Sequence, residues 1–438
     1  MRGYLKNENV LSDCKIYQML SAYAGEEHSS FHTPGHKVGA WDITELSFSD
    51  NLSCPKGCIA QAEQEIAVIL GAEKSFLLTD GSTSGVLSML YAAKTLGVKT
   101  VAVCENSHKS VFNACLALGL TPLVYPCESK EKIPFLPTMY ALKQDFSEIF
   151  DTADALFFTS PDYYGNVADL VGAREYCDKT GKLLLVDGAH GGHLHFHKEI
   201  YAGAYADIWV DGAHKSLPAF TQGAVVSART EKLAQALQDG VDIFRTTSPS
   251  YPIMASVEYA IKYPQNIALE KEVEAFCKGN KRIYQNADWT KLCAIFGENA
   301  FEVEKRLEEE KIYAEFCDGN VIEFYLSPAT SLEEFEGLKT RLSELFLQYP
   351  MQVVQSKKEV QRIPAPYLSK KEWVELSLSS GRRCARLCGL FPPCTPLFFI
   401  GERITEEKIR LLRKADNVFG LKDGKILVFI DEKEEENI

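Results

Sequence analysis

A lysine directly after a short apolar segment is the residue of this sequence best suited to covalent chemistry. In residues 206–223 the strand-like segment IWVD runs into His214 and Lys215. A buried ammonium is costly, so such a position favours a lowered pKa or a covalent use of the amine. Schiff-base formation is that covalent use. Taken alone, the stretch also allows Lys215 to extend from a strand end into solvent.

A second candidate site lies between an apolar strand and an apolar helix, in the sequence TDGSTSGVLSML. Gly81, Ser82 and Thr83 stand where the helix would begin. Backbone N–H groups and hydroxyls that converge at a helix N-terminus can bind a phosphate. The same residues also suit a simple helix cap. The sequence matches neither a Walker motif nor GxGxxG, so it gives no specific support for a nucleotide.

Asp187 follows the run LLLV, which predicts a strand buried on both faces. A buried carboxylate needs a cationic or hydrogen-bonding partner, and a protonated heterocyclic nitrogen would serve. The histidines that follow recur every two or three residues, at His190, His193, His195 and His197. They could bind a metal or lie on a strand, but no carboxylate or cysteine has liganding spacing, so we expect no metal.

Short apolar strands alternate with helical segments through the first part of the chain. This order predicts βαβ units and a mainly parallel sheet with helices on both faces. Ligands of such sheets gather at the carboxyl ends of the strands. The side chains expected there are His108, the Tyr163 and Tyr164 pair, Asp187, His190 and the His214 and Lys215 pair.

Changes in composition and in the predicted secondary-structure pattern along the chain predict three domains. Residues 1–265 would form an N-terminal segment and a large α/β domain, 266–350 a small α+β domain, and 351–438 a C-terminal domain. A basic, proline-containing stretch at 357–366 looks like a linker, and the chain closes on an acidic tail.

The amino-acid composition argues against some classes of binding partner. The formal charge is -13, which argues against nucleic acid, because phosphate backbones attract basic surfaces. We expect a small-molecule substrate and no membrane partner, since no apolar run has the length of a signal or a membrane span. We therefore expect a cytoplasmic protein, in which the 13 cysteines stay reduced.

Several motifs together resemble a known family. They are FHTPGHKVG, TDGSTSG, the HKS of ENSHKSV, SPDYYGNVADL, DGAHGGHL, HKSLPAFTQG, TSPSY and FIGERIT, and Lys215 lies 28 residues after Asp187. The chain resembles the Orn/Lys/Arg decarboxylases, pyridoxal-phosphate (PLP) enzymes of the aspartate-aminotransferase fold (fold type I), in the compact form typical of Gram-positive bacteria. The resemblance implies a mainly parallel seven-stranded sheet in the large domain, PLP as cofactor, and decarboxylation of arginine, lysine or ornithine.

The resemblance also implies roles for single residues. Lys215 would form the Schiff base with PLP, Asp187 would pair with the pyridine nitrogen, and His108 would stack on the ring. The phosphate loop would comprise Gly81, Ser82, Thr83 and His214. His190 would lie near the phenolic oxygen or the substrate carboxylate, and Lys215 or His214 could return a proton to the α-carbon. The loop at 247–251 would approach a partner subunit's site, which implies a homodimer or a higher oligomer.

Three positions depart from the family pattern. Gly212 stands where a serine would give the phosphate a hydroxyl, Gly188 where an acidic or small polar residue is commoner, and Cys394 where glycine is usual. These departures leave two alternatives open. One is another PLP-dependent reaction, such as transamination or elimination, and the other is a degenerate paralogue with a binding or regulatory role.

Overall fold

The chain forms two compact units. One comprises Met1–Cys104 and Asn113–Val353, and the other Glu105–Phe112 and Val354–Ile438. The computed structural model describes residues 5–37, 41–130, 133–350, 371–391, 394–415 and 417–430, with the backbone alone for 128–130 and 133–135. The predicted linker at 357–366 and the acidic tail lie outside the described residues. The three-domain division stays a prediction.

A seven-stranded sheet organises the first unit, as the sequence predicts. Its order is β1 (Lys74–Leu78), β9 (Ala224–Ala228), β8 (Ile208–Asp211), β7 (Leu183–Gly188), β6 (Ala155–Thr159), β2 (Thr100–Cys104) and β3 (Thr121–Tyr125). The five strands from β8 to β3 run parallel, and only β9 runs antiparallel to its neighbours. The sheet is therefore mainly parallel.

The register of the parallel strands brings the predicted site residues to one edge. Thr159 of β6 pairs with Asp187 of β7, and Asp187 pairs with Val210 of β8. The strands of this part of the sheet are apolar without alternation, and β7 and β8 are buried almost throughout. Such runs are typical of strands covered on both faces, so polar side chains concentrate at the carboxyl ends.

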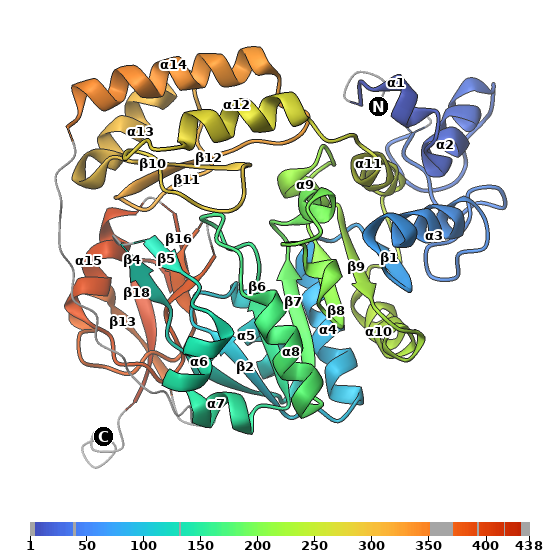
Figure 1. Ribbon diagram of the computed structural model, residues 1–438. Coiled ribbons are helices and arrows are strands. Elements are labelled where there is room, and N and C mark those ends of the chain that lie inside the picture. The colour runs from blue at the N-terminus through green and yellow to red at the C-terminus, as the bar shows by residue number, and fades with distance from the viewer. Residues whose placement is uncertain are drawn as a thin grey trace. The chain divides into compact units, whose positions relative to one another are not determined.

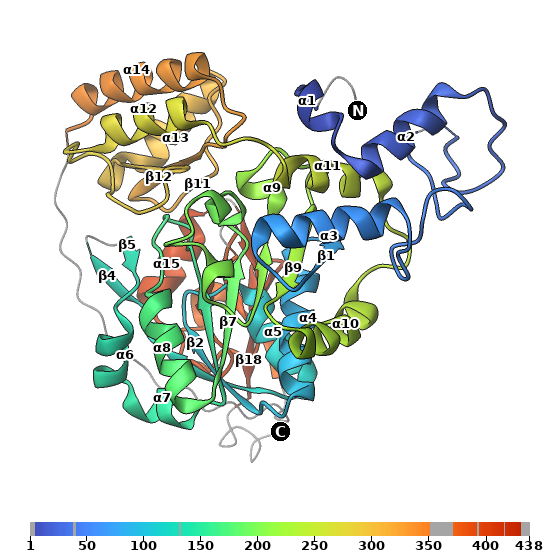
Figure 2. The same cartoon turned by 45° about the vertical axis from the view of Figure 1, so that its right-hand side comes forward.

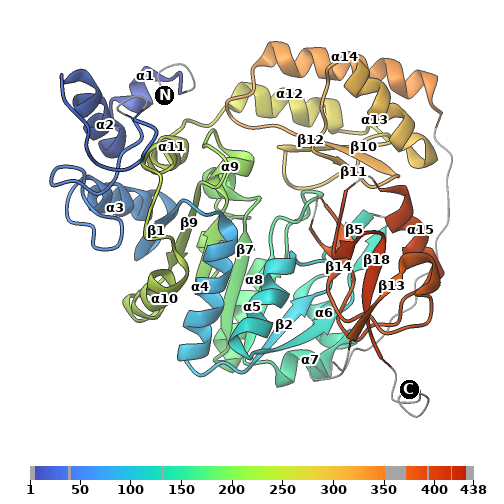
Figure 3. The same cartoon turned by 180° about the vertical axis from the view of Figure 1, so that it is seen from behind.

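Helices cover both faces of this sheet. Figures 1 and 3 show α4 and α8 on opposite faces, and α10 packs along α4. The helices of this part of the chain are α1 (Glu8–Leu11), α2 (Lys15–Gly25), α3 (Cys58–Leu70), α4 (Ser82–Thr95), α5 (Lys109–Leu118), α6 (Met139–Asp145), α7 (Ser147–Thr152), α8 (Leu170–Thr180), α9 (Ala213–Ser216), α10 (Glu231–Phe244) and α11 (Tyr251–Ile261). A hairpin, β4 (Glu128–Lys130) and β5 (Ile133–Phe135), lies between β3 and α6.

A glycine allows α4 to pack closely against the sheet. A Cβ atom at Gly85 would lie 2.6 Å from Val210 Cγ2 and 3.0 Å from Leu78 Cδ1. No side chain fits there without movement of its neighbours. The close contact places the N-terminus of α4 next to the end of β8, the strand that leads to Lys215.

A smaller sheet with helices on one face completes the first unit (Figure 2). Its strands are β10 (Lys291–Ile295), β12 (Val321–Tyr325) and β11 (Phe316–Cys317), in that order, and its helices are α12 (Ile267–Cys277), α13 (Ala300–Glu309) and α14 (Leu332–Gln348). Apolar residues of β10 and β12 pack with the helices in one core. On the other face, the apolar Ile295 and Val321 lie at one end, and the polar Glu323, Lys291 and Tyr325 follow, with Lys291 paired with Tyr325. That second face therefore brings polar groups toward the site.

The described C-terminal residues of the second unit form two further three-stranded sheets and the helix α15 (Glu406–Lys414). Its strands are β13 (Lys371–Glu375), β18 (Lys425–Phe429) and β17 (Leu421–Lys422) in one sheet, and β15 (Pro396–Phe398), β14 (Cys388–Leu390) and β16 (Val418–Phe419) in the other. Helix α15 (Glu406–Lys414) contributes Ile409 and Leu412 to its core. All 13 cysteines of the chain lie among the described residues, and each carries a free thiol.

Candidate functional site

Lys215 lies on a one-turn helix rather than at the strand end itself. Strand β8 ends at Asp211, and α9 then carries His214 and Lys215. The Lys215 amine does not end in solvent. Its Nζ lies 2.8 Å from His190 Nε2 and 5.3 Å from the centre of the Tyr163 ring.

His190 links Lys215 to the small sheet. It follows β7 in the turn after Asp187, and its side chain is almost fully buried, with 3% exposed. Its Nδ1 lies 3.0 Å from the hydroxyl of Tyr325, at the end of β12. The Tyr163 ring packs on the imidazole with 4.3 Å between ring centres. Two hydrogen bonds therefore join Tyr325, His190 and Lys215 in series.

Asp187 is a buried carboxylate close to Lys215. It is 3% exposed, and its Oδ1 accepts a hydrogen bond from the Ala189 N–H at 3.1 Å. Burial raises the pKa of Asp187, while the charge of Lys215 and the Ala189 N–H act to lower that pKa. A cationic partner would keep this carboxylate ionised.

The N-terminus of α4 does not have the expected hydroxyl cap. Gly81 is the capping residue, with φ of 84°, and no side chain bonds the first turn there. Ser82 Oγ is buried and has no partner among the described residues, whereas the Thr83 side chain is exposed. Ser84 bonds Asp80 and the Gly81 carbonyl instead. The turn therefore combines a helix N-terminus that no side chain caps with one buried hydroxyl that has no described partner.

His214 donates inward, to the backbone. Its Nδ1 lies 2.9 Å from the Gly223 carbonyl oxygen. Burial lowers the pKa of His214, the bond to Gly223 raises it, and the charge of Lys215 lowers it further. In the neutral imidazole Nδ1 is therefore the donor, and Nε2 is an acceptor. The role of His214 as a phosphate ligand stays a prediction.

His108 belongs to the short segment that groups with the second unit. Its Nδ1 lies 2.8 Å from Ser110 Oγ and accepts the Ser110 N–H at 3.3 Å. These bonds fix the orientation of the imidazole relative to its own helix α5. The expected stacking of His108 on the cofactor ring stays a prediction.

Two of the three departures coincide with close backbone packing. A Cβ atom at Gly212 would lie 2.3 Å from the Ala189 carbonyl oxygen and 3.0 Å from Ser82 Oγ, so a serine does not fit there without a shift. A Cβ atom at Gly188 would lie 3.0 Å from the Val210 carbonyl and 3.2 Å from Asp211 Oδ1. A buried carboxylate is therefore already present beside position 188, on the neighbouring strand.

The third departure, Cys394, occupies a backbone conformation that favours glycine. Its φ is 61°, in the left-handed region. Glycine adopts this region without steric cost, whereas other residues are strained there. A turn that suits glycine is thus retained although the residue has changed.

The histidines after His190 do not form the strand that was one alternative. Residues Gly192–Phe196 form a 3-10 helix, in which each histidine has its own protein partner. His193 Nε2 lies 2.8 Å from Asp288 Oδ1, His195 Nδ1 lies 2.7 Å from the Gly192 carbonyl, and His197 contacts Glu270. Within the described part of the chain, no three His, Cys, Asp or Glu side chains are arranged to hold a metal.

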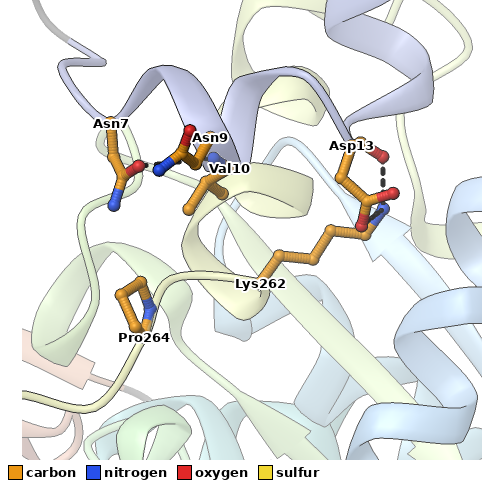
Figure 4. A pocket seen from close by; sticks show the side chains of 6 residues that line it. All are labelled: Asn7, Asn9, Val10, Asp13, Lys262 and Pro264. Atoms are coloured by element: carbon orange, nitrogen blue, oxygen red, sulfur yellow. Dashed lines mark hydrogen bonds and ion pairs between the residues drawn. The ribbon is translucent and has the colours of Figure 1, made fainter.

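A pocket of about 350 Å³ lies elsewhere, beside α1 and α11 (Figure 4). It is lined by Asn7, Asn9, Val10, Asp13, Lys262 and Pro264. The Lys262 ammonium is already paired with Glu258 at 3.0 Å and Asp13 at 3.4 Å. None of the predicted site residues lines this pocket, so it does not enlarge the site.

The sequence did not predict that residues of the small sheet contribute to the site. Tyr325 and its neighbour Lys291 lie more than a hundred residues after His190, in segments that read as ordinary strands of an α+β domain. The only local signal was a polar residue at alternate positions of a strand, in VIEFY. This signal predicts a second polar face but not what that face meets.

Comparisons with known proteins agree with this geometry. The pattern described as Orn/Lys/Arg decarboxylase, major domain, matches residues 40–296, more than half of the chain. YaaO of Bacillus subtilis (strain 168), a protein described as uncharacterized, is 29% identical over 95% of this chain and 99% of its own length. Arginine decarboxylase of the same organism is 29% identical over 91% of this chain and 93% of its own length.

Solved structures show the same fold. The constitutive lysine decarboxylase of E. coli has a TM-score of 0.72 at 18% identity, over 96% of this chain and 82% of that one. A structure of SPT with PLP has a TM-score of 0.54 at 13% identity, over 78% of this chain and 85% of that one. The chain therefore has the fold type I architecture of PLP-dependent enzymes. With the family pattern spanning the sheet, Asp187 and Lys215, the protein belongs to the Orn/Lys/Arg decarboxylase family.

Proposed function

We propose that the protein decarboxylates a basic amino acid to the corresponding amine, with PLP bound at Lys215. The observation that carries the proposal is the position of the Lys215 amine, 2.8 Å from the buried His190 and within the electrostatic reach of the buried Asp187. A lysine in such a setting is suited to carbonyl chemistry. The family membership supports the same reaction.

The described residues fit the phosphate and the ring nitrogen of PLP. Ser82 Oγ is a buried hydroxyl in need of a partner, at a helix N-terminus that no side chain caps. A phosphate would satisfy both. Asp187 needs a cation to stay ionised in its buried position, and a protonated pyridine nitrogen is such a cation.

The chain's residues then have separate tasks. PLP, when bound, supplies an electron sink for the charge left behind as carbon dioxide departs. Asp187 would hold the proton on the ring nitrogen, and Ser82 with the first turn of α4 would hold the phosphate. His190 orients the Lys215 amine through its 2.8 Å contact. Lys215, or His214 beside it, would return a proton to the α-carbon.

Arginine is the first substrate to test among arginine, lysine and ornithine. Relatives that match over 90% or more of this chain include arginine decarboxylases, as in Bacillus subtilis and Bacillus anthracis. The lysine decarboxylase of E. coli matches over 55% of this chain. The products would be agmatine or a diamine, which connects the protein to polyamine metabolism.

A homodimer is the proposed minimal assembly. In the described loops near the N-terminus, Phe31 is 94% exposed and Phe48 is 47% exposed. We propose that these two aromatic side chains take part in the contact with the second copy of the chain. We further propose that the loop at 247–251 reaches the site of the partner subunit. Tyr251, at its end, is buried and donates to the Asp50 carbonyl at 2.7 Å, whereas Thr247 and Ser248 are exposed.

The test is an absorption spectrum of the full chain with PLP, for the wild type and for Lys215→Ala. The wild type should show the visible band of a lysine-linked cofactor, and Lys215→Ala should lack it. Lys198→Ala, which removes an exposed lysine outside the predicted site residues, is the control and should keep the band. Arginine, lysine and ornithine are then added in turn, with release of carbon dioxide and of amine measured.

The outcomes distinguish decarboxylation from transamination and from a degenerate paralogue. Carbon dioxide with agmatine or a diamine supports the proposal and identifies the substrate. A keto acid would favour transamination instead. A wild type that binds PLP but releases no carbon dioxide from any of the three amino acids would overturn the decarboxylase proposal, and absence of the band would favour a degenerate paralogue.

A further inference from the structure

We propose that Asp80 is a positioning residue that joins the first turn of α4 to the loop at 247–251, and so affects PLP binding at the other subunit's site as well as at its own. This inference rests on the proposed roles of that turn and that loop in cofactor binding. One carboxylate would thereby act on both sites of the proposed dimer.

The Asp80 carboxylate lies between two segments that are far apart in the sequence. Its Oδ1 lies 2.7 Å from Ser84 Oγ, in the first turn of α4. Its Oδ2 accepts a hydrogen bond from the Thr246 N–H at 3.0 Å. Both distances are those of hydrogen bonds. Each oxygen of Asp80 therefore bonds a different element.

Thr246 extends this link into the loop. Its N–H donates to Asp80, and its Oγ1 accepts the Ser248 N–H at 3.2 Å. Thr247 and Ser248 are exposed, so burial does not fix their positions. The two hydrogen bonds at Thr246 therefore help to determine the path of the exposed part of the loop.

The other anchors of this loop lie outside α4. Arg245 is 7% exposed, and its guanidinium donates to the Leu52 carbonyl at 2.7 Å. Tyr251 holds the far end of the loop through its bond to the Asp50 carbonyl at 2.7 Å. Asp80 adds a direct link from the loop to the helix whose N-terminus is the proposed phosphate site.

A carboxylate suits this position because its two oxygens accept hydrogen bonds from two directions. Asp80→Ala removes both links. A simpler role for the same group is that of a negative charge near the N-terminus of α4, where it stabilises the helix dipole. That simpler role acts only within one chain, so an effect on the other chain separates the two.

The two links have consequences in different chains of a dimer. Through Ser84, Asp80 would order the phosphate turn of its own chain. Through Thr246, it would order the loop that is proposed to reach the site of the other chain. Loss of Asp80 from one chain should therefore weaken PLP binding at both sites.

The first test measures PLP binding in a dimer of two different chains. One chain is wild type, and the other carries Lys215→Ala with or without Asp80→Ala. The two chains have different affinity tags, are produced together, and the mixed dimer is isolated in two affinity steps. The visible band then comes only from the wild-type chain. We expect the Kd for PLP to rise about two- to tenfold when the other chain carries Asp80→Ala, the range for one hydrogen bond.

Asp242→Ala in the Lys215→Ala chain is the matched control. Burial lowers the pKa of Arg245, and nearby carboxylates, among them Asp242 and Asp80, act in the opposite direction. Asp242 is exposed and accepts from Gln238 within α10 at 2.8 Å rather than from the loop. The control should keep the Kd of the mixed dimer without it. An unchanged Kd with Asp80→Ala, or an equal rise in the control, overturns the proposal.

The second test uses full-length protein freed of PLP. Hydrogen–deuterium exchange of the peptide spanning residues 245–250 is followed by mass spectrometry. Asp80→Ala should speed exchange at Thr246 and Ser248 about tenfold, which corresponds to the loss of one hydrogen bond, and Asp242→Ala should not. Unchanged exchange in Asp80→Ala overturns the proposal, because Asp80 would then not hold the loop.

The outcomes separate this proposal from the proposed function. If the mixed dimer shows the effect but the wild type releases no carbon dioxide, the result counts against the proposed function alone. If the band forms and its Kd is the same with and without Asp80→Ala, the proposal for Asp80 fails alone. A wild type that forms no band, or that stays monomeric with PLP, overturns the effect of Asp80 on the other site, and the exchange experiment still decides whether Asp80 holds the loop.

Discussion

Buried carboxylates of this protein have two opposite environments. Asp211 accepts from the Tyr201 hydroxyl and the Trp209 N–H at one oxygen, while its other oxygen has no described partner. Burial raises its pKa to about 7. Asp288 instead lies 2.8 Å from His193 and near Lys291, and these partners outweigh burial and hold its pKa far below the usual range. When ionised, Asp211 destabilises the folded state, whereas ionised Asp288 stabilises it.

These environments predict opposite pH dependences for two matched substitutions. The folded chain keeps a proton on Asp211 that the unfolded chain loses between about pH 4 and pH 7, so this carboxyl's contribution to stability falls as the pH rises through that window. Asp211→Asn removes that loss, and its stability relative to the wild type should rise by about 3 kcal/mol from pH 4 to pH 7. Asp288→Asn should cost about 3–5 kcal/mol at neutral pH, because it breaks a buried pair.

The Asp288→Asn deficit should shrink as the pH falls below about 4, where the unfolded carboxyl gains its proton before the folded one does. The measurement is urea unfolding of both variants and the wild type, without cofactor, from about pH 3 to about pH 8. Parallel pH profiles for the two variants would contradict this account of their environments.

At the level of elements, the N-terminus of α4 combines two features that a simple cap does not have. Gly81 turns the chain with positive φ, and Gly85 allows the helix to approach Val210 closely. Ser82 Oγ is left buried and without a described partner beside Gly212. The serine hydroxyl expected at position 212 is absent, and we propose that Ser82 supplies a hydroxyl to the phosphate instead.

Ser82→Ala should therefore weaken PLP binding. Loss of one hydrogen bond to the phosphate corresponds to about 0.5–1.5 kcal/mol, or roughly a two- to tenfold rise in Kd. Ser88→Ala is the control within the same helix, since its hydroxyl bonds the Ser84 carbonyl inside α4. Titration of PLP by absorbance measures both. Equal affinity of Ser82→Ala and the wild type would show that the hydroxyl does not contact the phosphate.

At the level of the whole molecule, the site is proposed to need a second copy of the chain. Thr247 and Ser248 are exposed, although the loop that carries them is anchored at Tyr251. No helix among the described residues is long and apolar enough to cross a bilayer. A dimer built on two equivalent contacts would place each loop beside the other copy's Lys215.

Mixing two defective variants tests this arrangement. Lys215→Ala lacks the reacting amine, and Thr247→Asp brings a charge into the proposed contact, so each alone should have little activity. If each site takes Lys215 from one chain and Thr247 from the other, the mixed dimer has one intact site, and an equimolar mixture should regain about a quarter of wild-type activity. The assay is carbon dioxide release after unfolding and refolding together. No recovery would mean that the loop serves its own chain or none.

Much of this protein follows from the sequence because the signals are local. The run LLLV before Asp187, the strand before His214 and Lys215, and the glycine and hydroxyl turn at Ser82 each show their structure within about ten residues. Strand length, burial pattern and turn residues act over that range. The mainly parallel sheet is predictable from them, and the structure confirms it. The order of the strands is not predictable from them, and the place of the site at the carboxyl ends stays a prediction.

The tertiary structure decided what the local pattern leaves open. A 3-10 helix at residues 192–196 stands where a strand was one alternative, and its His193 pairs with the distant Asp288 whereas its His195 bonds the Gly192 carbonyl within the helix. The space that excludes a side chain at Gly212 depends on the Ala189 backbone of the neighbouring turn. The contact of Tyr325 with His190 joins residues 135 positions apart. Such contacts are set by how sheets and turns pack in three dimensions, and no pattern along the chain encodes their distances.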